Sequence, residues 1–317
     1  MQENVLNYPE RAHVELTSRC NFKCLTCKHG YESYGEDLDD DVCDVLVNEI
    51  IPNLKEIELQ GTGESLLSRN FSKVFNAAVE SKNCRLILIT NASLLSDEYI
   101  EKMVKSNMQL VVSLDGSDIE TFKMHRPVGN FESIIKNLYK VQTYRKKIGN
   151  SDFSFIINTV VTRKNIEKLK NMIDLASNIG IDYLFASEVR ECMPNKMMWN
   201  EFRLDNYDNR EKLNKFIIEC KDYANGKNVG FNFNPYLEEK TQKKKVCISP
   251  WKHIFIFANG DVSVCCELNK KFGNIKEDAF KAIWNSEKLN DFRNNMLFED
   301  YDKHCLECCL PWGITYE

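Results

Sequence analysis

The segment Cys20-Asn21-Phe22-Lys23-Cys24-Leu25-Thr26-Cys27 directly follows His13-Val14-Glu15-Leu16-Thr17, whose side chains alternate as in a short strand. Thiolate is the ligand that iron–sulfur clusters take, so cysteines separated by three and then two residues can hold one corner of a [4Fe–4S] cluster. Such a set leaves one iron without a protein ligand, and an open coordination position lets a metal bind a substrate or cofactor. The alternative is a zinc knuckle completed by another cysteine from elsewhere in the chain.

The Cys-x3-Cys-x2-Cys spacing after a first strand resembles the radical S-adenosylmethionine (radical SAM) superfamily. The resemblance implies that Cys20, Cys24 and Cys27 ligate a [4Fe–4S] cluster and that SAM chelates the open iron. It also implies that one electron from the cluster cleaves SAM to a 5′-deoxyadenosyl radical, which takes a hydrogen atom from the substrate. The residue before the third cysteine is often aromatic in the family, but here it is Thr26, which leaves the sheltering of the adenine open.

The composition excludes several classes of protein. A chain of 317 residues can form one large core with a smaller satellite, or two domains. The net charge is −5 with acids and bases interspersed, so neither nucleic acid nor an anionic membrane is an expected partner. The first residues contain no apolar stretch, so neither a signal peptide nor a spanning helix is expected. Thirteen cysteines without a secretion signal favour metal ligands in a reducing cytoplasm over disulfides.

Strand-like and helix-like segments alternate six times, and the strands are continuous apolar runs typical of parallel strands covered on both faces. This pattern predicts an α/β fold, a partial (β/α)6 TIM-type barrel, and the family resemblance implies the same barrel with one open side. In such barrels the chemistry lies on loops after the strands. The expected strands are residues 13–17, 56–60, 85–90, 109–114, 153–161 and 183–186, and the expected helices are residues 38–51, 71–79, 97–104, 131–144 and 166–176.

The second strand ends in Gly61-Thr62-Gly63-Glu64-Ser65, where glycines allow close approach of the backbone to a ligand and a carboxylate can accept an ammonium group. The loop resembles the Gly-Gly-Glu motif that holds the methionine amine of SAM, although Thr62 and Ser65 stand where Gly and Pro are commoner. An ordinary turn is the alternative. Asn91, which follows the third strand, is expected to face the same pocket.

Further strand ends carry the other predicted SAM contacts. Ser113 and Asp115 share one face by strand periodicity, and the resemblance implies that this end of the fourth strand meets the ribose hydroxyls. Arg126 resembles the arginine that pairs with the SAM carboxylate, with a helix-surface arginine as the alternative. Asn158 and Val160 are expected on the adenine side, although Asn158 equally fits a satisfied core amide.

The sixth strand ends in Glu188-Val189-Arg190-Glu191-Cys192, which by topology faces the substrate. We expect Arg190 to bind the substrate, Glu188 to transfer a proton and Cys192 to donate a hydrogen atom. The alternative for Cys192 is a small buried apolar side chain.

A charged run at 238–245 predicts a boundary between a barrel domain, residues 1–236, and a second domain, residues 237–317. Beyond it, Asn259-Gly260 predicts a hairpin, and a helix is expected at roughly 278–296. This region resembles the SPASM domain of radical SAM enzymes, and more closely its shortened twitch form. The resemblance implies one auxiliary [4Fe–4S] cluster, with structural zinc as the alternative. The expected ligands are Cys247, Cys265, Cys305 and Cys308, and Cys266 and Cys309 are neighbours that could replace them.

Two substrate classes remain open. In the first, the enzyme oxidises or epimerises a carbon of a small polar metabolite such as a sugar or aminocyclitol. In the second, it modifies a peptide or protein as SPASM maturases of the RiPP or sulfatase type do. Only about ten residues precede the first strand, which favours the small molecule because a leader-recognition domain has no room. Either reaction needs an external one-electron reductant such as flavodoxin or ferredoxin. A non-catalytic metal-binding protein would require the SAM-facing loops to be coincidental.

Overall fold

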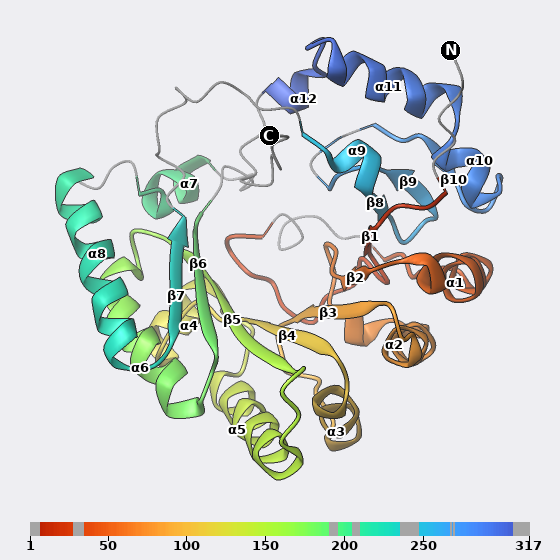
Figure 1. The fold of residues 1–317 in the computed structure, drawn as a ribbon. Helices are drawn as coiled ribbons and strands as arrows, with labels where there is room; N and C mark the ends of the chain where they lie inside the picture. The colour runs from red at the N-terminus through yellow and green to blue at the C-terminus, as the bar shows by residue number, and fades with distance from the viewer. Residues whose placement is uncertain are drawn as a thin grey trace. The chain divides into compact units, whose positions relative to one another are not determined.

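The computed structural model describes residues 7–27, 35–189, 196–204, 210–234, 247–266, 268 and 270–306. Parallel strands alternate with helices along the chain, which confirms the predicted α/β class (Figure 1). The chain divides into two compact units. The first unit contains Met1–Arg19, Gly35–Ile87 and Glu239–Glu317, and the second contains Cys20–Tyr34 and Leu88–Glu238. Strand β3 (Arg85–Thr90) carries the chain from the first unit into the second.

The first unit contains the beginning of the predicted barrel and the C-terminal hairpin. Its strand order is β10-β9-β8-β1-β2, with β1 parallel to both β2 and β8, and β9 antiparallel to β8 and β10. The strands are β1 (Arg11–Val14), β2 (Glu56–Leu59), β8 (His253–Ile256), β9 (Asp261–Ser263) and β10 (Gly273–Asn274). The helices are α1 (Asp40–Val45), α2 (Phe71–Glu80), α9 (Ser249–Lys252), α10 (Phe280–Trp284), α11 (Glu287–Leu297) and α12 (Lys303–Leu306).

The second unit is a parallel sheet in the order β4-β5-β6-β7. Its strands are β4 (Met108–Ser113), β5 (Ser154–Val161), β6 (Tyr183–Glu188) and β7 (Gly230–Asn234). Its helices are α3 (Asp97–Lys105), α4 (Ile119–His125), α5 (Phe131–Ile148), α6 (Leu169–Ile179), α7 (Lys196–Phe202) and α8 (Arg210–Gly226). Helices α5, α6 and α8 lie along one face of this sheet (Figure 1).

Alternating burial along β5 separates the two faces of the second sheet. Phe155, Ile157 and Val161 are fully buried, whereas Asn158 and Val160 lie on the less buried face. Successive strand residues point to opposite faces, so one face packs into the core and the other is less buried.

Several features differ from the sequence-based expectation. The first strand lies at Arg11–Val14 and not at 13–17. The predicted helix over 38–51 is an α-helix only as far as Val45, and continues as π-helical and 3-10 turns with Pro52 in the last of them. The predicted helix near 278–296 is two helices, because Ser286 caps α11 by accepting a hydrogen bond from Leu289 N. Strand β7, with alternating Phe231 and Phe233, was not predicted.

Within the described ranges, no helix is both long and apolar enough to cross a membrane.

Candidate functional site

The cysteine segment of the second unit is held by its own backbone and by a buried phenylalanine. Cys20, Cys24 and Cys27 are all half-buried. Phe22, between the first two, is only 5% exposed. Leu25 N donates a hydrogen bond to the carbonyl of His125 at 2.8 Å, which fixes the segment at the end of α4. The backbone of the segment is therefore held in place around Phe22 and the end of α4.

The Cys24 thiol is affected by the charges of Arg126, Cys27 and Cys20. Burial raises the pKa of the Cys24 thiol to about 12, the guanidinium of Arg126 opposes this rise, and the neighbouring Cys27 and Cys20 add to it. Neighbouring thiolates repel one another unless a positive group lies between them, and the irons of an iron–sulfur cluster would supply that charge. The donor set and its surroundings thus fit a cluster. Across the described residues, no three His, Cys, Asp or Glu side chains lie close enough to hold a single metal ion.

Asn91, predicted to face SAM, makes a hydrogen bond to the cysteine segment. Its Nδ2 donates to Asn21 Oδ1 at 2.9 Å, and Asn21 Nδ2 donates to Ser93 Oγ at 2.8 Å. Ser93 donates its N–H and its hydroxyl to Asn91 Oδ1 at 2.9 and 2.6 Å. Ala92 between them has a positive φ of 60°, a backbone conformation that few non-glycine residues adopt. The turn after β3 therefore binds Asn21, the residue after Cys20, through two hydrogen bonds.

Asp115 and Arg126 form a buried ion pair beside Cys24. Arg126 Nε donates to Asp115 Oδ2 at 2.8 Å, and the two side chains are 8% and 0% exposed. The other carboxylate oxygen accepts the N–H of Val160 at 2.8 Å. Burial alone would lower the pKa of Arg126, but the charges of Asp115 and Cys24 outweigh burial and raise it. Asp115 was predicted to meet a ribose; in the structure its carboxylate oxygens bind Arg126 and Val160.

The less buried face of the second sheet brings several predicted residues together. Ser113, Asn158, Phe185 and Asn232 are register partners on β4 to β7, so their side chains share a face. Asn158 Oδ1 is buried and finds no hydrogen-bond donor among the described residues. Buried carbonyl oxygens are almost always paired, so this acceptor fits a donor on a bound ligand. Asn232 was missed because β7 was not predicted.

The predicted substrate residues after the sixth strand are described only in part. Arg190 and Cys192 lie outside the described residues. Glu188 is 7% exposed and, by strand alternation, shares its face with the fully buried Leu184 and Ala186. Its neighbour Ser187 is on the other face, the one that carries Val160.

In the first unit, the Gly61–Glu64 loop follows β2 and packs against the end of β1. Glu64 is 3% exposed, and its N–H donates to the carbonyl of Arg19 at 2.8 Å. A Cβ on Gly63 would lie 2.4 Å from the carbonyl oxygens of Arg19 and Thr17, so only glycine permits this approach.

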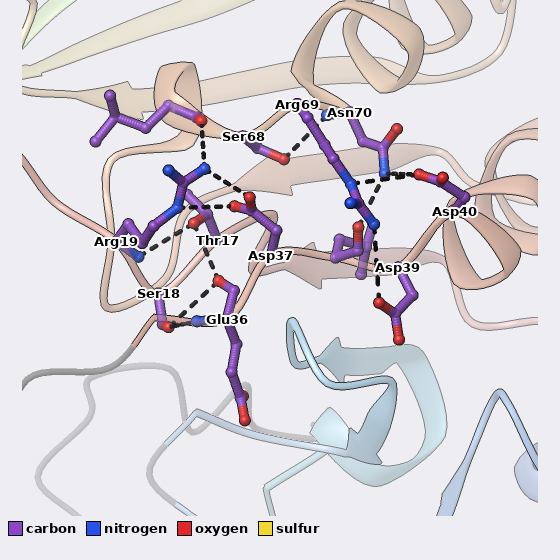
Figure 2. A network of polar contacts seen from close by, with 12 residues as sticks. Thr17, Ser18, Arg19, Glu36, Asp37, Asp39, Asp40, Ser68, Arg69 and Asn70 are labelled. Atoms are coloured by element: carbon purple, nitrogen blue, oxygen red, sulfur yellow. Dashed lines mark hydrogen bonds and ion pairs between the residues drawn. The ribbon is translucent and has the colours of Figure 1, made fainter.

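A polar network joins the chain on either side of the cysteine segment (Figure 2). The guanidinium of Arg19, the residue before Cys20, binds both carboxylate oxygens of Asp37 at 2.5 and 3.3 Å and the carbonyl of Leu67 at 2.9 Å. Ser18 Oγ accepts the N–H of Glu36 at 2.9 Å. The two ends of the loop that carries the cysteines are thus fastened together within the first unit.

The C-terminal cysteines lie around the hairpin. Cys247, Cys265 and Cys305 are half-buried, Cys266 is exposed, and Cys308 and Cys309 lie outside the described residues. His253 Nδ1 donates to the carbonyl of Val264 at 3.0 Å, which holds the residue before Cys265 against the start of β8. Helix α11 is tied to this region by Arg293, whose Nε donates to the carbonyl of Pro250 at 2.8 Å.

A parallel α/β fold with three closely spaced cysteines after β1 is consistent with an enzyme that binds an iron–sulfur cluster. The family model described as the Radical SAM superfamily matches residues 14–176, and the SPASM iron–sulfur cluster-binding domain matches residues 247–309. The first match covers just over half of the 317 residues, so this chain belongs to the radical SAM superfamily. The predicted SAM and iron–sulfur cofactors are thereby confirmed.

Relatives and solved structures agree with this assignment. The chain is 27% identical to a tungsten-containing aldehyde ferredoxin oxidoreductase cofactor-modifying protein of Pyrococcus furiosus, over 94% of this chain and 86% of the relative. It is 26% identical to an AdoMet-dependent heme synthase of Methanosarcina barkeri, over 95% and 91%. The fold is similar to that of Streptococcus suis SuiB bound to S-adenosylmethionine, with a TM-score of 0.70 and 18% identity over 91% of this chain and 68% of SuiB. The predicted TIM-type barrel with a C-terminal SPASM domain is confirmed.

Proposed function

We propose that this chain uses SAM to abstract a hydrogen atom from a cofactor or cofactor precursor. The observation that supports its radical chemistry most directly is the set of three closely spaced cysteines in the second unit. The guanidinium of Arg126 lies close enough to Cys24 to favour its thiolate form. When bound, the cluster and SAM supply the one-electron cleavage that yields a 5′-deoxyadenosyl radical. The protein's own contribution is to supply Cys20, Cys24 and Cys27 as ligands.

The proposed SAM contacts differ in how well the local structure supports them. Arg126 is held by Asp115, which orients a permanently charged group for the SAM carboxylate. Asn158 offers an unpaired acceptor, with Ser113 and Val160 on the same face. The Gly61–Glu64 loop is proposed to bind the methionine amine through Glu64. Asp115 and Asn91 are proposed to act indirectly, by holding Arg126 and the cysteine segment.

We propose that Cys247, Cys265, Cys305 and Cys308 ligate one auxiliary [4Fe–4S] cluster, with Cys266 and Cys309 as the alternative ligands. We also propose that the division between the barrel and this domain lies near residues 236–237. An external one-electron reductant such as flavodoxin or ferredoxin is required by the chemistry. Arg190, Glu188 and Cys192 stay candidates for substrate binding, proton transfer and hydrogen-atom donation.

The proposed substrate class is supported by the names of two relatives that align over most of both chains. One is named for modifying a tungsten cofactor and the other for making heme. Neither name supports the sugar or aminocyclitol that the sequence led us to expect. A structure of SuiB bound to its precursor peptide SuiA, with a TM-score of 0.67 and 19% identity over 92% of this chain and 67% of SuiB, fits the alternative of a peptide substrate.

The test is to add fractions of a host extract to the reconstituted, reduced enzyme and measure 5′-deoxyadenosine. The proposal predicts that a fraction below about 1 kDa raises its formation at least tenfold above the rate without substrate, and that protease treatment leaves this stimulation intact. If only a larger fraction stimulates the reaction and protease abolishes the effect, the substrate is a peptide or protein and the proposal of a cofactor substrate is wrong.

A further inference from the structure

Glu15, the residue after β1, has a buried carboxylate whose hydrogen bonds come from neutral donors. The residue is 6% exposed. Its Oε2 accepts the N–H of Thr62 at 2.7 Å and the Thr62 hydroxyl at 2.8 Å. Its Oε1 accepts a longer bond of 3.5 Å from the N–H of Ala258, beyond β8. Burying a carboxylate costs free energy unless it is hydrogen-bonded, and these donors offset that cost for Glu15.

The Gly61–Glu64 loop is shaped around this side chain. A Cβ on Gly61 would lie 2.4 Å from Cγ of Glu15, so the close approach requires glycine at this position. Thr62 supplies both a backbone and a side-chain donor to the same oxygen, and a glycine in its place would supply only the first. The Glu15 side chain therefore accounts for two residues of the loop sequence.

The contact also limits how the loop can move. Glu15 itself is fixed in the sheet, because its N–H donates to the carbonyl of Ile256 on β8 at 2.9 Å. If the loop moved away, the carboxylate would lose both short hydrogen bonds while remaining buried. A loop held in one conformation binds its ligand without a further ordering cost.

We propose that Glu15 is a positioning residue that, through Thr62, holds the Gly61–Glu64 loop in its SAM-binding conformation. This inference rests on the proposed function, in which that loop binds SAM. Glu15 touches the loop and does not need to touch the ligand.

The test compares Glu15→Gln, Thr62→Val and the double variant of the full, iron-reconstituted chain. Two readouts are the dissociation constant of SAM and the hydrogen–deuterium exchange of loop peptides in the absence of SAM. A charge-assisted hydrogen bond contributes about 1.5 kcal/mol or more, so each single variant is expected to bind SAM about tenfold more weakly. Gln keeps a neutral acceptor and Val keeps only the backbone N–H, so both changes weaken the same contact. The double variant should therefore be no more than about twofold worse than the poorer single variant.

Matched controls separate positioning from general stability. Thr62→Ser keeps the hydroxyl and should bind SAM within about twofold of wild type. Glu58→Gln changes a carboxyl on β2, outside the loop, whose Oε1 lies 3.9 Å from His13 Nδ1, and should leave loop exchange and SAM affinity unchanged. Iron content and melting temperature are measured for every variant, since a purely structural role would lower these without a loop-specific change in exchange.

The outcomes distinguish this inference from the proposed function. Faster loop exchange and weaker SAM binding in Glu15→Gln, with non-additive effects in the double variant, would support positioning. Unchanged loop exchange in Glu15→Gln, or fully additive losses of affinity, would overturn it. A wild-type chain that contains iron but binds no SAM would instead refute the proposed function, whatever the exchange result.

Discussion

Replacing Asp115 with Asn should destabilise the chain more than any comparable change at an exposed ion pair. Asp115 is fully buried, and its Oδ2 accepts from Arg126 Nε at 2.8 Å. Asn can keep the bond from Val160 with its oxygen, but its amide N–H2 then faces the N–H of Arg126. Two donors meet, and the guanidinium is left as a buried charge without its carboxylate.

The magnitude follows from the burial of the pair. Breaking a buried ion pair by removing one partner costs about 3–5 kcal/mol. An unfolding entropy of about 2.1 cal/mol/K per residue gives about 0.67 kcal/mol/K for 317 residues. The melting temperature of Asp115→Asn should therefore fall by about 4–7 °C.

The assay is anaerobic thermal unfolding followed by circular dichroism, on protein with matched iron content. The control is Asp97→Asn, which breaks a 2.7 Å pair with Lys140 whose side chains are 60% and 38% exposed. That change should cost less than about 1 kcal/mol, or about 1.5 °C. The double variant Asp115→Asn, Arg126→Gln should be less destabilised than the sum of the two single variants. A shift of Asp115→Asn no larger than that of the control, or full additivity, would refute the reasoning.

Three further predictions concern other parts of the two units. Asn91→Ala removes the hydrogen bonds that hold the cysteine segment, and should release iron to a chelator about fivefold faster than wild type; an unchanged rate would contradict this role. Gly63→Ala forces a methyl group against the carbonyl of Arg19 and should lower the unfolding free energy by about 1–3 kcal/mol in urea titrations, whereas a neutral effect would mean that the loop packs differently. Burial, and then Glu56, raise the pKa of Glu58 to about 7 from an ordinary value of 4.5. The folded state therefore binds this proton more tightly than the unfolded state, so the wild type loses stability as pH rises from 4.5 through about 7. Gln does not titrate, so the unfolding free energy of Glu58→Gln relative to wild type should rise by about 1–2 kcal/mol between pH 5 and pH 8. A difference that does not change with pH would refute this.

Local pattern was sufficient for most of the fold. Strands such as β5 combine apolar runs with strict alternation, and turn residues mark their ends, so most barrel strands were predicted close to their observed bounds. The first strand was expected at 13–17 but lies at Arg11–Val14. Strand β7 was missed because asparagines interrupt its two phenylalanines and the surrounding residues carry no clear periodicity. The break between α10 and α11 was missed because Ser286 can sit in a helix as readily as at its start.

The candidate site was predictable where a residue type has few other uses. Closely spaced cysteines point to a metal from sequence alone. Glu15 was missed because a carboxylate after a strand belongs to no motif, and its partner Thr62 is 47 residues away. Asp115 was recognised as polar and well placed, but its pairing with Arg126 depends on the fold bringing α4 back beside β4. Glu15 and Asp115 hold other residues in place, and this role becomes visible only from their contacts in the folded chain.

The measurement that tests the central claim most directly is SAM cleavage by the anaerobically reconstituted chain with dithionite as reductant. The account predicts formation of 5′-deoxyadenosine by wild type and none by Cys24→Ala, because the cluster that receives SAM needs this thiolate. It also predicts about eight irons per wild-type chain and about four in a Cys24→Ala variant that retains the auxiliary cluster. Wild-type protein that carries its iron but forms no 5′-deoxyadenosine, or a Cys24→Ala variant that forms as much as wild type, would contradict the account.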